Sequence, residues 1–172
     1  MKYQDNEFEA KTFEKVDFTD ESFESANFID CKFVNCNLSN VDLANARLQN
    51  VAFEDCKILG LNFLECDKLF IEFSFESCDI SLTNFSDLDL KNTIFENCQI
   101  IECDFVKTNL TRASFEGSDL ENSYFENTNL SFASFKNAKN YSINPNQNTL
   151  KGTIFSIPQA VGLLDTFDIR LE

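Results

Sequence analysis

The chain has 172 residues, the length of one domain, with a formal net charge of −15 and no histidine. An excess of acidic residues this large excludes direct nucleic-acid binding, because the phosphate backbone repels it. No apolar run is long enough to span a membrane and no segment resembles a signal peptide, so we expect a cytoplasmic protein without membrane contact.

A bulky apolar residue recurs at every fifth position along most of the chain. Neither a helix nor a flat strand has a period of five, so the pattern predicts a solenoid whose repeats bury their apolar residues against each other. Asp or Asn often precedes the bulky residue, as at Asp17 and Asn37, and favours tight turns through side-chain hydrogen bonds to the backbone. The bulky residues are Phe8, Phe13, Phe18, Phe23, Phe28, Phe33, Leu38, Leu43, Leu48, Phe53, Ile58, Phe63, Ile80, Phe85, Leu90, Phe95, Ile100, Phe105, Leu110, Phe115, Leu120, Phe125, Leu130 and Phe135.

All seven cysteines occupy the small, inward-pointing position of the repeat, where a thiol is a slim apolar filler. Four of them should stack one coil apart, at about 4.8 Å, but parallel side chains have poor geometry for a disulfide. We therefore expect free, buried thiols, and without histidine we expect no zinc site. The stacked four are Cys36, Cys56, Cys78 and Cys98, and the others are Cys31, Cys66 and Cys103.

The pattern breaks between residues 64 and 77. Lys68 stands where a bulky apolar residue is expected, and a buried unpaired ammonium group would be very costly. We expect a bulge or short loop with Phe70 or Phe75 partly exposed. Two interpretations stay open, a tolerated insertion and a small contact loop.

Beyond Ala138 the sequence predicts a turn-rich loop near residues 140–148, then one more partial coil. Ser156 and Gln159 have the spacing of a capping box and predict a short helix over residues 158–166, followed by a strand-like tail.

The apolar residues of this C-terminal segment can form a lid over the open end of the solenoid. Helical spacing places Ala160, Leu164 and Phe167 on one face. The segment contains more apolar residues than a lid requires, so we also expect a homodimer, since most oligomers are symmetric pairs. The predicted dimer interface is formed by Val161, Leu163, Leu164, Phe167, Ile169 and Leu171.

The repeat of a small residue, Asp or Asn, Leu or Phe and two polar residues closely resembles the pentapeptide-repeat family. Examples are residues 26–30, 36–40 and 108–112, and the resemblance runs from about Asn6 to Ala138. It implies an all-β fold, a right-handed quadrilateral β-helix with about 20 residues per coil. We accordingly divide the chain into a β-helix over residues 1–157 and a C-terminal helix and tail over residues 158–172.

Assigning successive repeats to the four faces of such a coil gives two adjacent acidic faces, provided that the break keeps the order of the faces. A rod with an acidic side resembles a nucleic-acid duplex electrostatically, so the basic channel of a DNA-binding protein would attract it. An inert acidic rod is the alternative. One face carries Glu21, Glu24, Asp42, Glu65, Asp87, Asp104 and Glu126, and its neighbour carries Asp17, Asp20, Asp79, Glu102, Asp119 and Glu121, with Lys57, Lys107 and Lys139 among them.

Residues 156–160 and the ending over residues 167–171 also look similar to the quinolone-resistance branch of the family, the Qnr and MfpA type. That resemblance implies a head-to-head dimer through the C-terminal helix. It also implies an acidic surface that imitates B-form DNA, binds a type II topoisomerase (DNA gyrase or topoisomerase IV) and protects it from fluoroquinolones. Several members of that branch carry longer projecting loops, and here only residues 68–77 could serve as one.

The sequence offers no catalytic motif: it has four scattered glycines, no phosphate-binding loop and no nucleophile elbow. We therefore expect a protein that is not an enzyme and has no cofactor. Two alternatives to topoisomerase mimicry stay open. One is an acidic scaffolding module that binds another partner through the region of Phe70 and Phe75 or a flat face, and the other is an immunity factor that protects topoisomerases from a peptide toxin.

Overall fold

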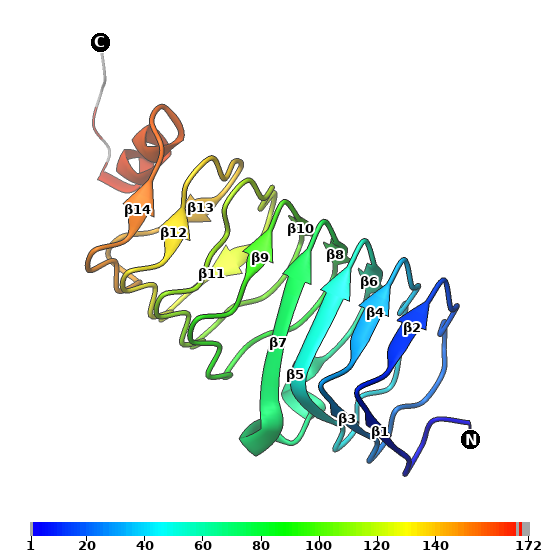
Figure 1. Ribbon diagram of the computed structural model, residues 1–172. Helices are drawn as coiled ribbons and strands as arrows, with labels where there is room; N and C mark the ends of the chain where they lie inside the picture. The colour runs from blue at the N-terminus through cyan, green and yellow to red at the C-terminus, as the bar shows by residue number, and fades with distance from the viewer. Residues whose placement is uncertain (1, 168, 170–172) are drawn as a thin grey trace.

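The computed structural model describes residues 2–167 and 169, and these form a right-handed quadrilateral β-helix of about seven coils (Figure 1). Each repeat forms one short side of a coil and pairs in parallel with the same side of the next coil. Phe8 is thus in register with Phe28, and Phe28 with Leu48. The predicted fold is confirmed.

The strands are short because each side contains only one repeat. The largest sheet has the order β1 (Glu7–Glu9), β3 (Asn27–Ile29), β5 (Arg47–Glu54), β4 (Lys32–Val34) and β2 (Thr12–Glu14), and β7 (Ile71–Glu76) pairs with β5 and with β9 (Phe95–Glu96). A second sheet contains β6 (Lys57–Leu59), β8 (Asp79–Ser81) and β10 (Gln99–Ile101). Near the C-terminus β11 (Tyr124–Phe125) pairs with β13 (Ser142–Ile143), and β12 (Ser134–Phe135) pairs with β14 (Ile154–Phe155).

The sides stack into four faces, which we number in chain order and define by their inward-pointing residues. Face 1 contains Phe8, Phe28, Leu48, Leu90, Leu110 and Leu130. Face 2 contains Phe13, Phe33, Phe53, Phe75, Phe95, Phe115 and Phe135. Face 3 contains Phe18, Leu38, Ile58, Ile80, Ile100 and Leu120. Face 4 contains Phe23, Leu43, Phe63, Phe85, Phe105 and Phe125.

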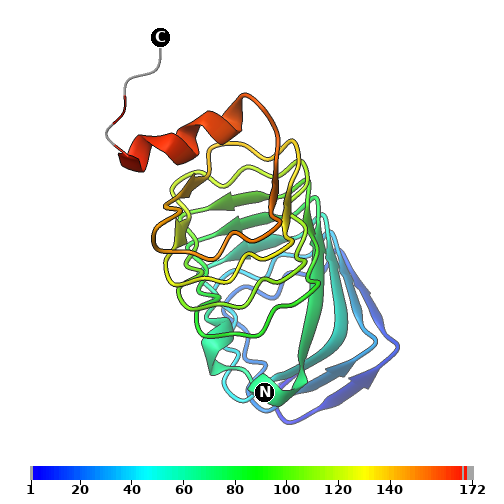
Figure 2. The same ribbon diagram turned by 90° about the vertical axis from the view of Figure 1, so that its left-hand side faces the viewer.

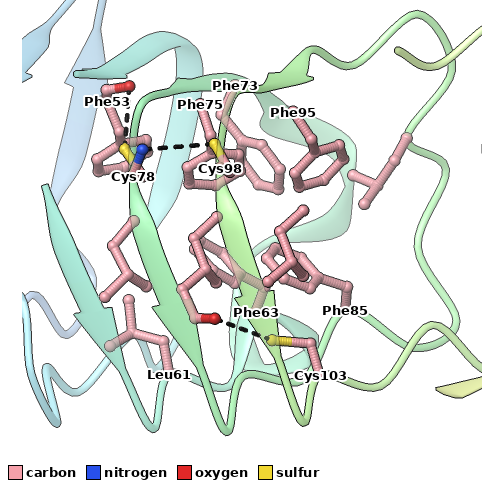
Figure 3. Close-up of a cluster of buried hydrophobic side chains, with 14 of the residues drawn as sticks. Phe53, Leu61, Phe63, Phe73, Phe75, Cys78, Phe85, Phe95, Cys98 and Cys103 are labelled. Atoms are coloured by element: carbon pink, nitrogen blue, oxygen red, sulfur yellow. Dashed lines mark hydrogen bonds between the residues drawn. The ribbon is translucent and has the colours of Figure 1, made fainter. Parts of the chain in front are cut away.

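Phenylalanine rings fill the core in two regular arrangements (Figure 3). Rings on one face stack nearly parallel, as for Phe85 and Phe105, whose centroids lie 5.0 Å apart with the planes at 8°. Rings on the opposite faces 2 and 4 meet edge to face across the core, as for Phe85 and Phe95 at 5.5 Å and 86°. Both arrangements are favourable for aromatic pairs, and together they recur through the coils from Phe63 to Phe135.

The cysteines lie in this core as free thiols, as predicted, and all seven are buried. The backbone N–H of Cys78 donates to Sγ of Cys98 at 3.4 Å, and the Cys78 thiol donates to the carbonyl of Phe53 at 3.4 Å (Figure 3). The backbone N–H of Cys36 likewise donates to Sγ of Cys56 at 3.4 Å, and the carbonyl of Cys56 accepts the N–H of Asp79, so the four predicted thiols stack along one corner. Burial raises the pKa of the Cys66 and Cys103 thiols to about 12.

Two devices turn the chain at each corner. The side-chain oxygen of Asn37 accepts the backbone N–H of Ser39 at 3.1 Å, and equivalent bonds recur at other Asp and Asn residues, as predicted. The residue two positions after the bulky one adopts a positive φ, for example 56° at Asn40. This left-handed conformation favours Gly, Asn and Asp.

The break contains two short 3-10 turns, η1 (Phe63–Glu65) and η2 (Lys68–Phe70). The Lys68 side chain lies outside the core and Phe70 is 39% exposed, as expected, whereas Phe75 is fully buried in the stack of face 2. Asn62 before the break pairs with Asn84 after it. The order of the faces is therefore kept.

The chain turns at residues 144–147 and ends in η3 (Gln159–Phe167), a 3-10 helix that lies across the last coil (Figure 2). The predicted capping box is wrong. Oγ of Ser156 accepts the backbone N–H of Asn137 at 2.9 Å, so in the described part of the chain it is engaged with the preceding coil. Of the predicted tail strand over residues 168–172, only Ile169 is among the described residues.

Candidate partner-binding surface

Face 4 brings together the first set of predicted acids: Glu21, Glu24, Asp42, Glu65, Asp87, Asp104 and Glu126. Asp104 pairs with Asn84 on the previous coil, and Asp87 donates its backbone N–H to Val106 at 2.9 Å. Asp42, Glu65, Asp87 and Asp104 are exposed, while the other three acids are half-buried. The middle of face 4 therefore presents carboxylates to solvent.

Face 3, next to it, holds the second set: Asp17, Asp20, Asp79, Glu102, Asp119 and Glu121. Asp119 differs from the rest, because it is paired with Lys139 at 3.2 Å and accepts a bond from Asn140 at 2.8 Å. Hydrogen bonds from the side chain and backbone of Thr19 lower the pKa of Asp17. Exposed Asp79, Glu102 and Glu121 remain the more available carboxylates of this face.

Some of the predicted acids also accept hydrogen bonds from the backbone or from a neighbouring coil. Asp42 accepts from the N–H of Ala44 at 3.0 Å and from the hydroxyl of Ser22 at 3.1 Å. Glu24 accepts from the side chain of Gln4 at 2.6 Å. These bonds fix the direction of the carboxylates, which lowers the entropic cost of binding a partner.

Sequence reasoning missed a third acidic feature, a column of glutamates on face 2. Glu54, Glu76, Glu96 and Glu116 each follow the bulky Phe, and Glu54, Glu76 and Glu96 are in register. Three of these carboxylates have partners within the chain: Lys32 lies 2.5 Å from Glu54, and serine hydroxyls donate to Glu96 and Glu116. The signal was present as Phe-Glu in four successive coils, but basic residues elsewhere on the face made it look balanced.

The predicted dimer residues divide into two groups on η3. Leu163 is half-buried and packs against the core, so it belongs to the lid. Val161, Leu164 and Phe167 are exposed, and in a 3-10 helix residues three apart lie in one line. This line replaces the predicted face of Ala160, Leu164 and Phe167. Ile169 is also exposed, and Leu171 lies outside the described residues.

The loop at the break is a projection whose conformation is held by side-chain contacts. The carboxylate of Asp67 accepts from Leu69 N–H at 3.3 Å and from Arg47 Nε at 3.0 Å. The Arg47 guanidinium lies 4.8 Å from the centroid of the Phe70 ring. These contacts leave the Leu69 side chain 87% exposed at the tip.

Two kinds of site are not found in the described part of the chain. None of its helices has the length and apolar character needed to cross a bilayer. Among the same residues, no group of three or more His, Cys, Asp or Glu side chains is placed to hold a metal ion.

Residues 6–74 and 68–144 match the family model of the pentapeptide repeat region. Two trypsin-treated variants of QnrB1, described as a plasmid-mediated fluoroquinolone resistance protein, are similar over 99% of this chain and 92% of theirs, with a TM-score of 0.51 and 19% identity. A third similar structure is that of HetL from the cyanobacterium Nostoc sp. strain PCC 7120, a pentapeptide repeat protein involved in heterocyst differentiation regulation. The similarity covers 90% of this chain and 86% of HetL, with a TM-score of 0.39 and 14% identity. None of the curated proteins matches the sequence.

Proposed function

The chain belongs to the pentapeptide-repeat family, and from this premise we propose that it is a DNA mimic that binds a type II topoisomerase, DNA gyrase or topoisomerase IV, and protects it from fluoroquinolones. The observation that carries the proposal is that faces 3 and 4, which are adjacent, hold both sets of acids. With about two carboxylates per coil and a coil spacing of about 4.8 Å, they carry one acid per roughly 2.4 Å of axis, against about 1.7 Å per charge in DNA. A basic channel built for DNA would attract such a surface.

Similarity to QnrB1 supports the choice of partner, because QnrB1 is described as a fluoroquinolone resistance protein. The likeness is one of fold, and a fold does not determine a function. The acids of this chain therefore supply the argument, and QnrB1 supplies the enzyme class to test first.

The exposed line of η3 supports a homodimer through the C-terminus. Joining two copies end to end would cover Val161, Leu164 and Phe167 and would extend the acidic rod to about twice its length. A longer rod could follow more of a DNA-binding channel.

The test is gyrase supercoiling with the purified protein, with and without ciprofloxacin, over a series of salt concentrations. We expect rescue from the drug or inhibition without it, weakening steeply as salt rises, because the attraction is between exposed charges. The variant Asp87→Lys/Asp104→Lys should lose at least tenfold in potency.

The control Glu9→Lys/Glu14→Lys makes the same change in net charge at exposed residues outside faces 3 and 4, and should keep wild-type potency. If the wild-type protein at micromolar concentration and low salt affects neither gyrase nor topoisomerase IV, the proposal is wrong.

A second candidate is a scaffolding module that binds a different partner through the loop at the break. The supporting observation is the leucine held out at its tip, Leu69, on a backbone fixed by Asp67 and Arg47. An apolar contact of this kind would persist at high salt. Leu69→Asn would abolish it and would leave the salt-sensitive effect on topoisomerase intact.

A further inference from the structure

A large apolar side chain stands at the corner between the two acidic faces, where the backbone disfavours it. Leu82 has a φ of 50° and is 59% exposed. The equivalent corner residues on the two preceding coils are Asn40 and Gly60, the types that suit a left-handed conformation. A leucine there costs about 1 kcal/mol relative to glycine and leaves apolar surface in water.

A second bulky corner residue, Phe132, provides a comparison. It also has a positive φ, 61°, but its ring lies over Gly152, where an added Cβ would stand 2.7 Å from the ring. The Arg112 guanidinium covers the same ring at 5.5 Å. Packing along the corner therefore accounts for Phe132.

The corner neighbours of Leu82 differ from those of Phe132, and Leu82 is the more exposed of the two residues, at 59% against 47%. Gly60 on one side has no side chain, and Glu102 on the other carries an exposed carboxylate. The backbone N–H of Leu82 donates to the carbonyl of Ile101 at 3.1 Å, a bond that any residue would make. The fold alone gives no reason for a leucine at this position.

Leu82 belongs to a small apolar patch on the side of face 3. Ser81, the residue before it, is in register with Leu59 on one neighbouring coil and Ile101 on the other. Leu59 and Ile101 are both half-buried, so part of each side chain faces solvent. We call Leu59, Leu82 and Ile101 the ridge patch.

Acids surround the ridge patch on both faces. Asp79 begins β8, the strand that ends one residue before Leu82, Glu102 occupies the next corner position, and Asp104 lies just across the corner on face 4. All three are exposed. An apolar centre with a charged rim is the arrangement found at the energetic centre of protein interfaces.

We propose that the ridge patch is an apolar anchor for a partner protein whose basic surface contains an apolar pocket that receives Leu82. Charge complementarity fixes the kind of occupant: the acidic rim repels a nucleic acid and equally repels a second copy of this chain. The proposal rests on the proposed function for the identity of the partner, a type II topoisomerase. It adds that recognition is not DNA-like throughout, because a leucine has no counterpart on a phosphate backbone.

The test is the affinity of the full-length protein for the gyrase holoenzyme and for topoisomerase IV, measured by biolayer interferometry over a series of salt concentrations. Leu82→Asn replaces the leucine with a residue that suits the left-handed corner, so the thermal midpoint should be unchanged or higher. We expect affinity to fall at least tenfold at every salt concentration. The dependence of affinity on salt should keep its slope, because no charge is altered.

Leu69→Asn is the matched control, since it makes the same change at an exposed leucine away from the corner, and it should bind as the wild type does. If Leu82→Asn keeps wild-type affinity while the wild type binds, the anchor is wrong and the proposed function stands. If the wild type binds neither enzyme, the proposed function fails and the anchor fails with it.

Discussion

The ring of Phe105 lies between those of Phe85 and Phe125, at 5.0 Å and 4.9 Å, with interplanar angles of 8° and 3°. The Phe105 ring is thus packed on both flat sides, and the Phe95 and Phe115 rings of the opposite face 2 meet it edge on. A solenoid has no other core, so stability is a sum over such local contacts.

We predict that Phe105→Ala destabilises the protein by about 3–5 kcal/mol, the usual cost of removing a buried aromatic ring. Phe8→Ala should cost clearly less, because Phe8 lies in the first coil and is half-buried. Urea unfolding followed by circular dichroism measures both. Equal losses at the two positions would contradict the argument from local stacking.

The hydroxyl group of Tyr141 is buried and has no hydrogen-bond partner among the described residues. We predict that Tyr141→Phe raises the free energy of unfolding by about 1 kcal/mol, because it removes an unsatisfied polar group and keeps the ring contacts with Phe135 and Phe155. Tyr124→Phe, at an exposed tyrosine, should change nothing measurable. A loss of stability in Tyr141→Phe would contradict the prediction.

The sequence predicted the regular part of the molecule well, because a period of five assigns each residue to one face and one depth. The acids of faces 3 and 4 and the stacked thiols lie where that period places them. At the break, the period indicates two extra residues, but it does not indicate whether the ring of Phe70 or that of Phe75 is buried in the core. Phe75 continues the face 2 stack and Phe70 packs on Arg47.

Features that depend on contacts between coils could not be predicted from the sequence. Ser156 has capping-box spacing, yet its hydroxyl is engaged with Asn137, 19 residues earlier. The left-handed corners also escaped prediction, because their residue types vary. Without them, Leu82 reads as an ordinary surface leucine.

The buried thiols should make the protein sensitive to high pH. Burial raises the pKa of Cys66 and Cys103 from 9.0 to about 12, so each contributes stability that is fully present below pH 9 and is lost as the pH rises toward 12. At about pH 10.5 the loss should be about 2 kcal/mol per thiol. We predict that Cys66→Ala/Cys103→Ala loses less stability than the wild type between pH 7 and this pH. Urea unfolding at the two pH values measures the difference, and equal losses would contradict the prediction.

Arg47 should control the order of the loop at the break. Arg47→Ala removes both the ion pair with Asp67 and the contact with the Phe70 ring, which are together worth about 1 kcal/mol at the surface. We predict faster amide hydrogen exchange over residues 67–71, with little change in global stability. Lys91→Ala, which breaks the surface pair with Asp89, is the control and should leave that exchange unaltered.

The dimer prediction differs from topoisomerase binding in its dependence on salt. The line of Val161, Leu164 and Phe167 is apolar, so salt should not weaken self-association and should relieve repulsion between two chains of net charge −15. We predict a dimer by light scattering at low and high salt. Leu164→Glu should be monomeric, because it places a charge in the middle of the line. Gln159→Glu adds the same charge at the exposed start of η3 and should stay dimeric, whereas a monomeric wild type would exclude this interface.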